Sequence, residues 1–187
     1  DPMELKFSMF QSDYRKVVAH LLKDETLKLV RDRALFFLLS YLGLRGGRGT
    51  INSVRLSNIK LFPQSGKAIL FRKPRTGRKD KAAREDGVVA SKIKSHDRTV
   101  YRRSLQPTSV RLFDSLWNFV KLRQMAVEKK HVSSDKLFLE LATTAKQMPV
   151  GEVMDRELVA FEDRADDERV VNDWFKSVCK DAGIEDW

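Results

Sequence analysis

The chain has 187 residues, of which 42% are hydrophobic and 33% charged, and its formal net charge is +10. This composition is typical of a globular protein and argues against a disordered chain; no apolar run approaches the roughly 20 residues that a membrane-spanning helix needs. Cys179 is the single cysteine, which excludes an internal disulfide and a cysteine zinc cluster.

The N-terminal part predicts a helix over 12–23, within a segment 1–27 that precedes the main body of the domain. Ser12 or Asp13 can cap this helix. Apolar side chains recur at helical spacing and form one stripe, made of Val17, Val18, Leu21 and Leu22. His20 lies beside that stripe, so we expect a histidine at the edge of the core rather than a ligand or a base.

Residues 31–44, RDRALFFLLSYLGL, give the strongest helix prediction. Leucines recur with 3.6-residue spacing, and Phe36, Phe37 and Tyr41 fill the other faces. A helix that is apolar all round belongs at the centre of a domain. Glycines from Gly43 onward are expected to end it.

A basic β-hairpin is expected over 67–105. Residues 50–62 are expected to form a short helical turn that leads into NIKLF. Residues 67–73 and 98–105 show the alternation of two strands. The long connection between them is interrupted by proline, glycine and charge.

The C-terminal half predicts two more helices. Pro107 suits the first turn of a helix over 107–124, and a second helix is expected over about 168–182, where Cys179 is a buried thiol. Between them, 135–141 is a short apolar segment and 142–165 is expected to contain a loop.

Charge is unevenly distributed along this single expected domain, 1–187. Residues 67–103 hold 13 Lys/Arg and 4 Asp/Glu, a local charge of +9 (13 − 4). The acidic C-terminal part, 151–187, holds 5 Lys/Arg and 12 Asp/Glu, a local charge of −7 (5 − 12). Concentrated positive charge predicts a polyanionic partner, because neutralising phosphates releases condensed counterions.

Common catalytic and cofactor motifs are missing from the sequence. There is no phosphate-binding Gly-x-x-x-x-Gly-Lys loop and no Gly-x-Ser-x-Gly elbow. His20, His96 and His131 lack ligand-like spacing, so neither a metal nor another cofactor is expected. We expect an intracellular protein, nuclear in a eukaryote and cytoplasmic or nucleoid-associated in a prokaryote or virus.

The order of these elements and several short phrases resemble the catalytic domain of tyrosine recombinases, the phage-type integrases. RDRALFFLLSYLGLR resembles the segment with their first active-site arginine, VRLSNIKL the stretch leading to their first strand, and KAILFRK the hairpin with their active-site lysine. DKLF and NDWFKSVCKDAGI resemble segments upstream of their second motif. The resemblance covers roughly residues 30–187. It implies an α+β, mostly helical fold, with a recombinase-like core and a small antiparallel β-hairpin or sheet.

The resemblance also implies site residues. Arg45 would bind the scissile phosphate and stabilise its transition-state charge, for which a planar bidentate donor is suited. Arg48 is the alternative, because the downstream NI lies closer to its expected distance from Arg48. Lys73 would protonate the leaving 5′ oxygen, with Lys67 and Arg75 as alternatives. The acidic residue that usually follows the first arginine is missing from GGRGTIN.

The sequence contains no His-x-x-Arg motif, and its three tyrosines all precede the place of the family's nucleophile. The chain as given is therefore expected to bind DNA without cleaving it; strand cleavage and rejoining would require further C-terminal residues. The predicted partner is double-stranded DNA, on which the chain could form a homo-oligomer. The expected DNA contacts are basic residues around the hairpin and its flanks: Arg48, Arg72, Arg75, Arg78, Lys79, Arg98, Arg102, Arg103 and Arg111.

Three other functions stay open. The first is a non-catalytic DNA-binding protein with a recombinase fold, of centromere or chromatin type. The second is an RNA-binding domain, which would need aromatic stacking platforms near the basic residues; Phe71 and Tyr101 flank them. The third is a basic helical protein that binds protein partners through its acidic C-terminal part.

Overall fold

The computed structural model describes residues 11–42, 54–71, 97–165 and 171–185. About half of these residues are helical, and the strands form two small antiparallel sheets, so the fold is α+β. The helices are α2 (Gln11–Leu21), α3 (Leu27–Ser40), α6 (Pro107–Glu128), α7 (Val150–Asp155) and α8 (Val171–Asp181), with 3-10 turns η1 (Leu56–Asn58) and η2 (Arg102–Ser104). The strands are β1 (Ile59–Phe62), β2 (Lys67–Leu70), β3 (Arg98–Tyr101), β4 (Leu139–Leu141) and β5 (Phe161–Ala165).

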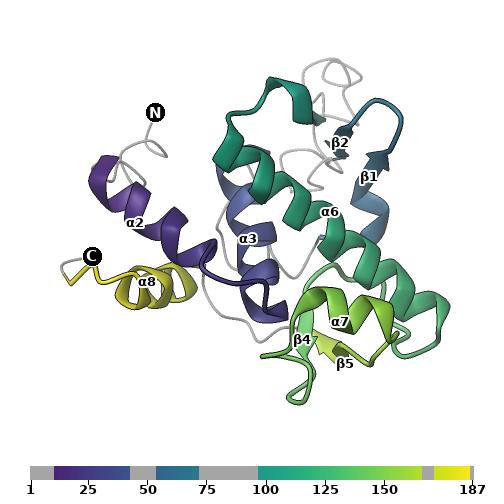
Figure 1. Ribbon diagram of the computed structural model, residues 1–187. Helices are drawn as coiled ribbons and strands as arrows, with labels where there is room; N and C mark the ends of the chain where they lie inside the picture. Colours follow the sequence, from purple (N-terminus) through teal and green to yellow (C-terminus); the bar gives the residue numbers. More distant parts are fainter. Residues whose placement is uncertain (1–10, 43–53, 72–96, 166–170, 186–187) are drawn as a thin grey trace, which may run out of the picture.

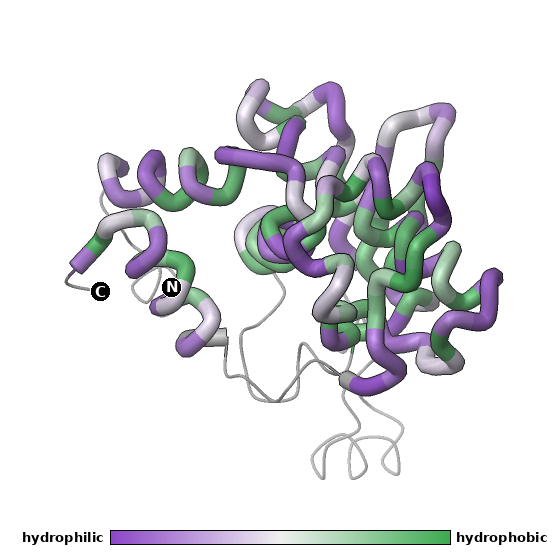
Figure 2. The backbone as a smooth tube through the Cα atoms, turned by 60° about the horizontal axis from the view of Figure 1, so that its bottom comes forward, coloured by the Kyte–Doolittle hydropathy of each residue, from purple (hydrophilic) through white to green (hydrophobic). Residues whose placement is uncertain are grey.

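Helices α3 and α6 pack against each other at the centre of the molecule (Figure 1). β1 and β2 lie on one side of α6, α7 with β4 and β5 lies on another, and α2 and α8 lie together beside α3. Aromatic rings join the parts: Phe37 meets Phe113 edge-on with ring centroids 5.7 Å apart, and Phe119 stacks on Phe138 at 5.5 Å. Figure 2 shows the repeated alternation of hydrophobic and hydrophilic residues that lets each helix bury one side.

The central helix differs from its prediction at both ends. It begins at Leu27, where the side chain of Thr26 accepts a hydrogen bond from the Leu29 amide, and it ends at Ser40 rather than at residue 44. It is also not apolar all round, because Asp32 and Arg33 are both almost completely buried. Such buried charges require partners, and each of these two has several.

Arg33 ties three segments together. Its guanidinium donates hydrogen bonds to the carbonyls of Leu21 and Asp24, and Nη1 lies 2.9 Å from a carboxylate oxygen of Glu25. Nη1 also lies 3.5 Å from the hydroxyl of Ser115 on α6. The α2–α3 connection is thus held against α3 by one side chain.

Asp32 holds the C-terminal helix to the centre. It accepts a 3.0 Å hydrogen bond from the indole nitrogen of Trp174 on α8 and lies 3.6 Å from Lys28 Nζ. Trp174, Phe175 and Val178 form the buried face of α8, and Cys179 is completely buried, as predicted. Burial raises the pKa of the Cys179 thiol to about 11, which fits a structural residue and not a nucleophile.

Arg123 on α6 is the second buried arginine. Its guanidinium donates to the carbonyls of Ser134, Lys136 and Leu137 and lies 5.1 Å from the ring centroid of Phe161. Burial lowers its pKa to about 10. This side chain therefore organises the connection between α6 and β4.

The predicted antiparallel hairpin is confirmed for its two strands. Lys67 pairs with Tyr101 and Leu70 with Arg98. Both strands are shorter than predicted, because β2 ends at Leu70 and the chain turns into η2 after Tyr101. Within the described residues the expected short helical turn is confirmed as η1, and the NIKLF segment that it leads into contains a third strand, β1, paired with β2.

The remaining helix predictions hold with shifted bounds. Ser12 and Asp13 lie inside α2 and do not cap it; its apolar stripe is buried, with His20 at the edge of the core. α6 extends four residues beyond the predicted end.

The loop expected over 142–165 contains α7 and β5. Within the described ranges no helix is both long and apolar enough to span a membrane.

Candidate nucleic-acid interface

The three-stranded sheet has one buried face and one outward face. Ile59, Ala68 and Leu70 are at most 4% exposed and point to the core. Because side chains alternate along a strand, the intervening positions point outward. The registry of the strands places six residues on this outward face: Lys60, Phe62, Lys67, Ile69, Thr99 and Tyr101.

Cationic side chains lie over aromatic rings on this face. Lys67 Nζ is 4.5 Å from the ring centroid of Phe62 and 5.9 Å from that of Tyr101. Lys60 Nζ lies 5.5 Å from the Phe62 ring, and Arg103 in η2 lies 5.1 Å from the Tyr101 ring. We call Lys60, Phe62, Lys67, Tyr101 and Arg103 the cation–aromatic face.

The three cations of this face have no carboxylate partner in the part of the chain that the structure describes. An exposed cation–π contact stabilises a side-chain position by only about 0.5–1 kcal/mol, so the ammonium and guanidinium groups keep their affinity for an anion. Cations that are positioned but unneutralised are suited to phosphate binding.

Four of the predicted DNA contacts lie within the described residues. Arg103 joins the cation–aromatic face. Arg98 lies on the other face of the sheet, opposite Leu70, and is exposed. Arg102 pairs with Asp114 on α6. Arg111 lies 3.7 Å from Glu25 and 3.4 Å from the Leu22 carbonyl, so it faces the α2–α3 connection.

The other predicted site residues lie outside the described residues. These are the two residues given catalytic roles and five expected DNA contacts: Arg45, Lys73, Arg48, Arg72, Arg75, Arg78 and Lys79. Their roles stay predictions.

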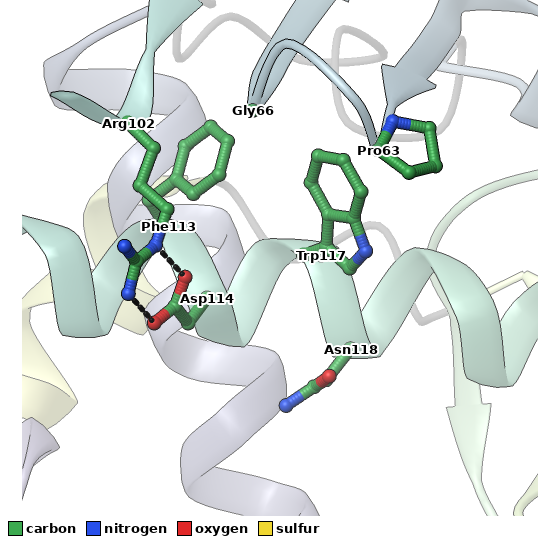
Figure 3. A pocket seen from close by; sticks show the side chains of 7 residues that line it. All are labelled: Pro63, Gly66, Arg102, Phe113, Asp114, Trp117 and Asn118. Carbon is green, nitrogen blue, oxygen red and sulfur yellow. Dashed lines mark hydrogen bonds and ion pairs between the residues drawn. The ribbon is translucent and has the colours of Figure 1, made fainter.

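A pocket of about 380 Å³ opens beside the cation–aromatic face, between the β1–β2 turn, η2 and α6 (Figure 3). It is lined by Pro63, Gly66, Arg102, Phe113, Asp114, Trp117 and Asn118. The Arg102 guanidinium pairs with Asp114 through two hydrogen bonds, from Nε to Oδ1 at 2.9 Å and from Nη2 to Oδ2 at 3.1 Å. The indole of Trp117 rises from α6 toward the β1–β2 turn.

Lys60, Phe62 and Trp117 are interface candidates that the sequence prediction did not include. Trp117 lies at helical spacing from Phe113, which is typical of a core position and gives no signal of an interface. For Lys60 a signal is present, because Ile59, Lys60 and Leu61 alternate with the period of a strand.

Tyr14 and Tyr41 do not resemble activated nucleophiles. Burial, and secondarily the neighbouring Tyr41, raise the pKa of Tyr14 to about 12, which disfavours its phenolate. The Tyr41 hydroxyl is hydrogen-bonded to Ser109, and Tyr101 lies on the cation–aromatic face. Among the described side chains, no group of three or more His, Cys, Asp and Glu is arranged to hold a metal ion.

Comparisons of the chain with models of protein families, with curated proteins and with solved structures find no match.

Proposed function

We propose that this protein binds double-stranded DNA and contacts its phosphates with the cation–aromatic face. The observation that carries the proposal is the arrangement of Lys60, Lys67 and Arg103, three cations that lie over two rings and lack carboxylate partners among the described residues. The +9 local charge of residues 67–103 supports a polyanionic partner.

The rings reduce the entropic cost of phosphate binding, because they already restrict the side-chain rotamers of the cations in the free protein. A lysine or arginine that is immobilised on binding loses about 0.5–1.5 kcal/mol of rotamer freedom. Lys67 lies within 6 Å of both rings, so part of this ordering is present before DNA arrives. Phosphate contacts of this kind position a duplex without reading its sequence.

Single-stranded RNA is the second candidate partner for this face. Single-stranded nucleic acids stack their bases on exposed aromatic faces, and Phe62 and Tyr101 lie in one row of the sheet. However, the faces of both rings are partly covered by cations, namely Lys60, Lys67 and Arg103. Less of each ring is then available to stack on a base, so we favour duplex DNA over single-stranded RNA.

The form that we propose for this protein is a recombinase-like DNA-binding core, on the resemblance of its sequence phrases to tyrosine recombinases. Phosphate binding by Arg45 or Arg48 and proton donation by Lys73 are part of the same proposal.

The test compares two triple variants in a salt series. Lys60→Ala, Lys67→Ala and Arg103→Ala together remove the cations of the cation–aromatic face. Lys16→Ala, Lys176→Ala and Lys180→Ala remove the same charge from exposed positions on α2 and α8. Each variant is titrated with labelled duplex DNA and with single-stranded RNA.

We expect the first triple variant to reduce the slope of log affinity against log salt by up to about 2.7, since each lost phosphate contact removes about 0.9. The control should change the slope much less. Equal slopes for the two variants would contradict this interface, and preference for single-stranded RNA would favour the second candidate.

A further inference from the structure

The pocket beside the cation–aromatic face combines a flat apolar wall with a polar end. Phe113 is 1% exposed and its ring centroid lies 5.7 Å from that of Trp117, so it supports the indole from within the core. Pro63 lies on the other side of the indole, in the β1–β2 turn (Figure 3). Lys121 Nζ lies 5.9 Å from the indole centroid, and because Lys121 is exposed, a base that stacks on the indole can displace its side chain into solvent. The paired side chains of Arg102 and Asp114 lie at the end away from Pro63.

This combination matches the chemistry of a nucleobase. A base has two flat apolar faces, which stack on indole rings, and a polar edge of hydrogen-bond donors and acceptors. Arg102 and Asp114 together offer both donors and acceptors, and Asn118, one turn after Asp114, offers an amide with both. The volume of about 380 Å³ is at the small end of the range of about 300–1,000 Å³ seen for small-molecule pockets.

The pocket is continuous with the cation–aromatic face. Phe62, Lys67 and Tyr101 form the last row of the sheet. The pocket residues Pro63, Gly66 and Arg102 are their direct neighbours in sequence. A phosphate held by Lys67 therefore leaves the adjoining nucleotide next to the pocket.

The β1–β2 turn is fixed to η2 beside the pocket. Gly66 has φ = +60°, a left-handed conformation that favours glycine, and an added Cβ would stand in ordinary van der Waals contact with the Arg102 Cβ, 3.7 Å away. Its carbonyl also accepts a 2.8 Å hydrogen bond from the Arg102 amide. The turn and η2 are thus fixed to each other, and with them two walls of the pocket.

We propose that this pocket binds a single unstacked base of the DNA that lies on the cation–aromatic face, with Trp117 as the stacking surface. The proposal rests on the proposed function, because the phosphates of that DNA bring the base to the pocket. A base that is already unpaired enters most easily, since it requires the least unstacking energy.

The test uses two duplexes with the same flanks, one fully paired and one with a single unpaired nucleotide at its centre. Binding of both is measured for the wild-type chain, Trp117→Leu and Trp117→Phe. Leucine keeps an apolar side chain against Phe113 but removes the aromatic face, while phenylalanine keeps a ring. Thermal unfolding of each variant checks that the domain is folded, and Pro63→Ala provides a second variant at an exposed position.

We expect the wild-type chain to prefer the duplex with the unpaired nucleotide by about fivefold or more. Trp117→Leu should lose this preference, Trp117→Phe should retain most of it, and Pro63→Ala should reduce it. Equal affinity of the wild-type chain for the two duplexes, or a preference that survives Trp117→Leu, would overturn the base pocket and leave the proposed function intact. Absence of binding to either duplex would overturn both.

Discussion

Two groups of cationic side chains in this protein have opposite surroundings. Arg33 and Arg123 are at most 1% exposed and donate to backbone carbonyls of nearby connections. Lys60, Lys67 and Arg103 lie at the surface of the sheet, where aromatic rings are their nearest partners among the described residues. The same charge is therefore committed to hydrogen bonds within the fold in one group and remains unneutralised at the surface in the other.

The difference separates the arginines with a structural role from the cations for which we propose a binding role, a distinction that residue type alone does not make. Burying a guanidinium without hydrogen-bond partners is costly, and Arg33 has its hydrogen bonds committed within the fold. Arg123 binds carbonyls through Nε and one terminal nitrogen, while its other terminal nitrogen is buried without a partner among the described residues. A cation over a ring is positioned but still able to bind an anion. The two groups should therefore respond differently to substitution, one in stability and the other in binding.

The largest effect is expected at the buried arginine Arg33. Arg33→Met removes the donors to the carbonyls of Leu21 and Asp24 and the contact with Glu25. Leaving such groups without partners costs about 1–3 kcal/mol each, so we expect a loss of about 3 kcal/mol or more in the free energy of unfolding. Urea denaturation measures this loss.

Arg15→Ala is the matched control, because Arg15 is an exposed arginine on α2. Its free energy of unfolding should lie within about 0.5 kcal/mol of the wild-type value. A similar stability loss in the two variants would mean that charge, and not the buried hydrogen bonds of Arg33, determines the effect.

A smaller effect is expected at the surface of the sheet. Phe62→Leu removes the ring beneath Lys60 and Lys67 but changes no charge. We expect the affinity for duplex DNA to fall about two- to fivefold, because more of the rotamer freedom of the two lysines is then lost on binding, while the slope against salt stays the same. Filter or fluorescence titration at several salt concentrations measures both quantities.

Phe62→Tyr keeps a ring at this position and should bind DNA like the wild-type chain. Tighter binding by Phe62→Leu would reverse the interpretation, because it would mean that the ring competes with phosphate for the two lysines.

The parts of the fold that sequence predicted well are those with local periodicity. The apolar stripes of α2, α6 and α8 follow from helical spacing, and the antiparallel pairing of β2 with β3 follows from alternation around a turn-rich connection. The burial of Asp32 could not be predicted this way. Its partner Trp174 lies 142 positions away, so only the assembled structure shows why the charge is tolerated.

The same limit applies to the candidate site. The local positive charge predicts DNA contacts for Arg98, Arg102 and Arg103 alike. Of these three, only Arg103 joins the cation–aromatic face. The end of β3 at Tyr101 separates them: Arg98 falls on the other sheet face, and Arg102 turns to Asp114. Strand register and one ion pair decide these roles, and neither is encoded in local composition.

The smallest effect on stability is expected at His20, which is neither fully buried like Arg33 nor fully exposed. It is partly exposed at the edge of the core, and its pKa is lowered, mainly by burial and then by Lys23. Lys28 acts in the same direction, while Asp181 and Asp32 oppose it. The folded state therefore prefers the neutral imidazole.

A lowered pKa in the folded state means that the unfolded chain binds more protons between the folded pKa and the ordinary value of 6.5. Stability should then fall as the pH drops through this window, and the contribution of His20 should be constant below it. His20→Gln should remove this part of the pH dependence, which urea denaturation at pH 7.5 and at about pH 5 would show for both chains. If stability depends on pH identically in the wild-type chain and in His20→Gln, the titrating group is another residue. If the dependence is smaller in His20→Gln, even partial burial favours the uncharged form of a side chain, as burial does for Arg123.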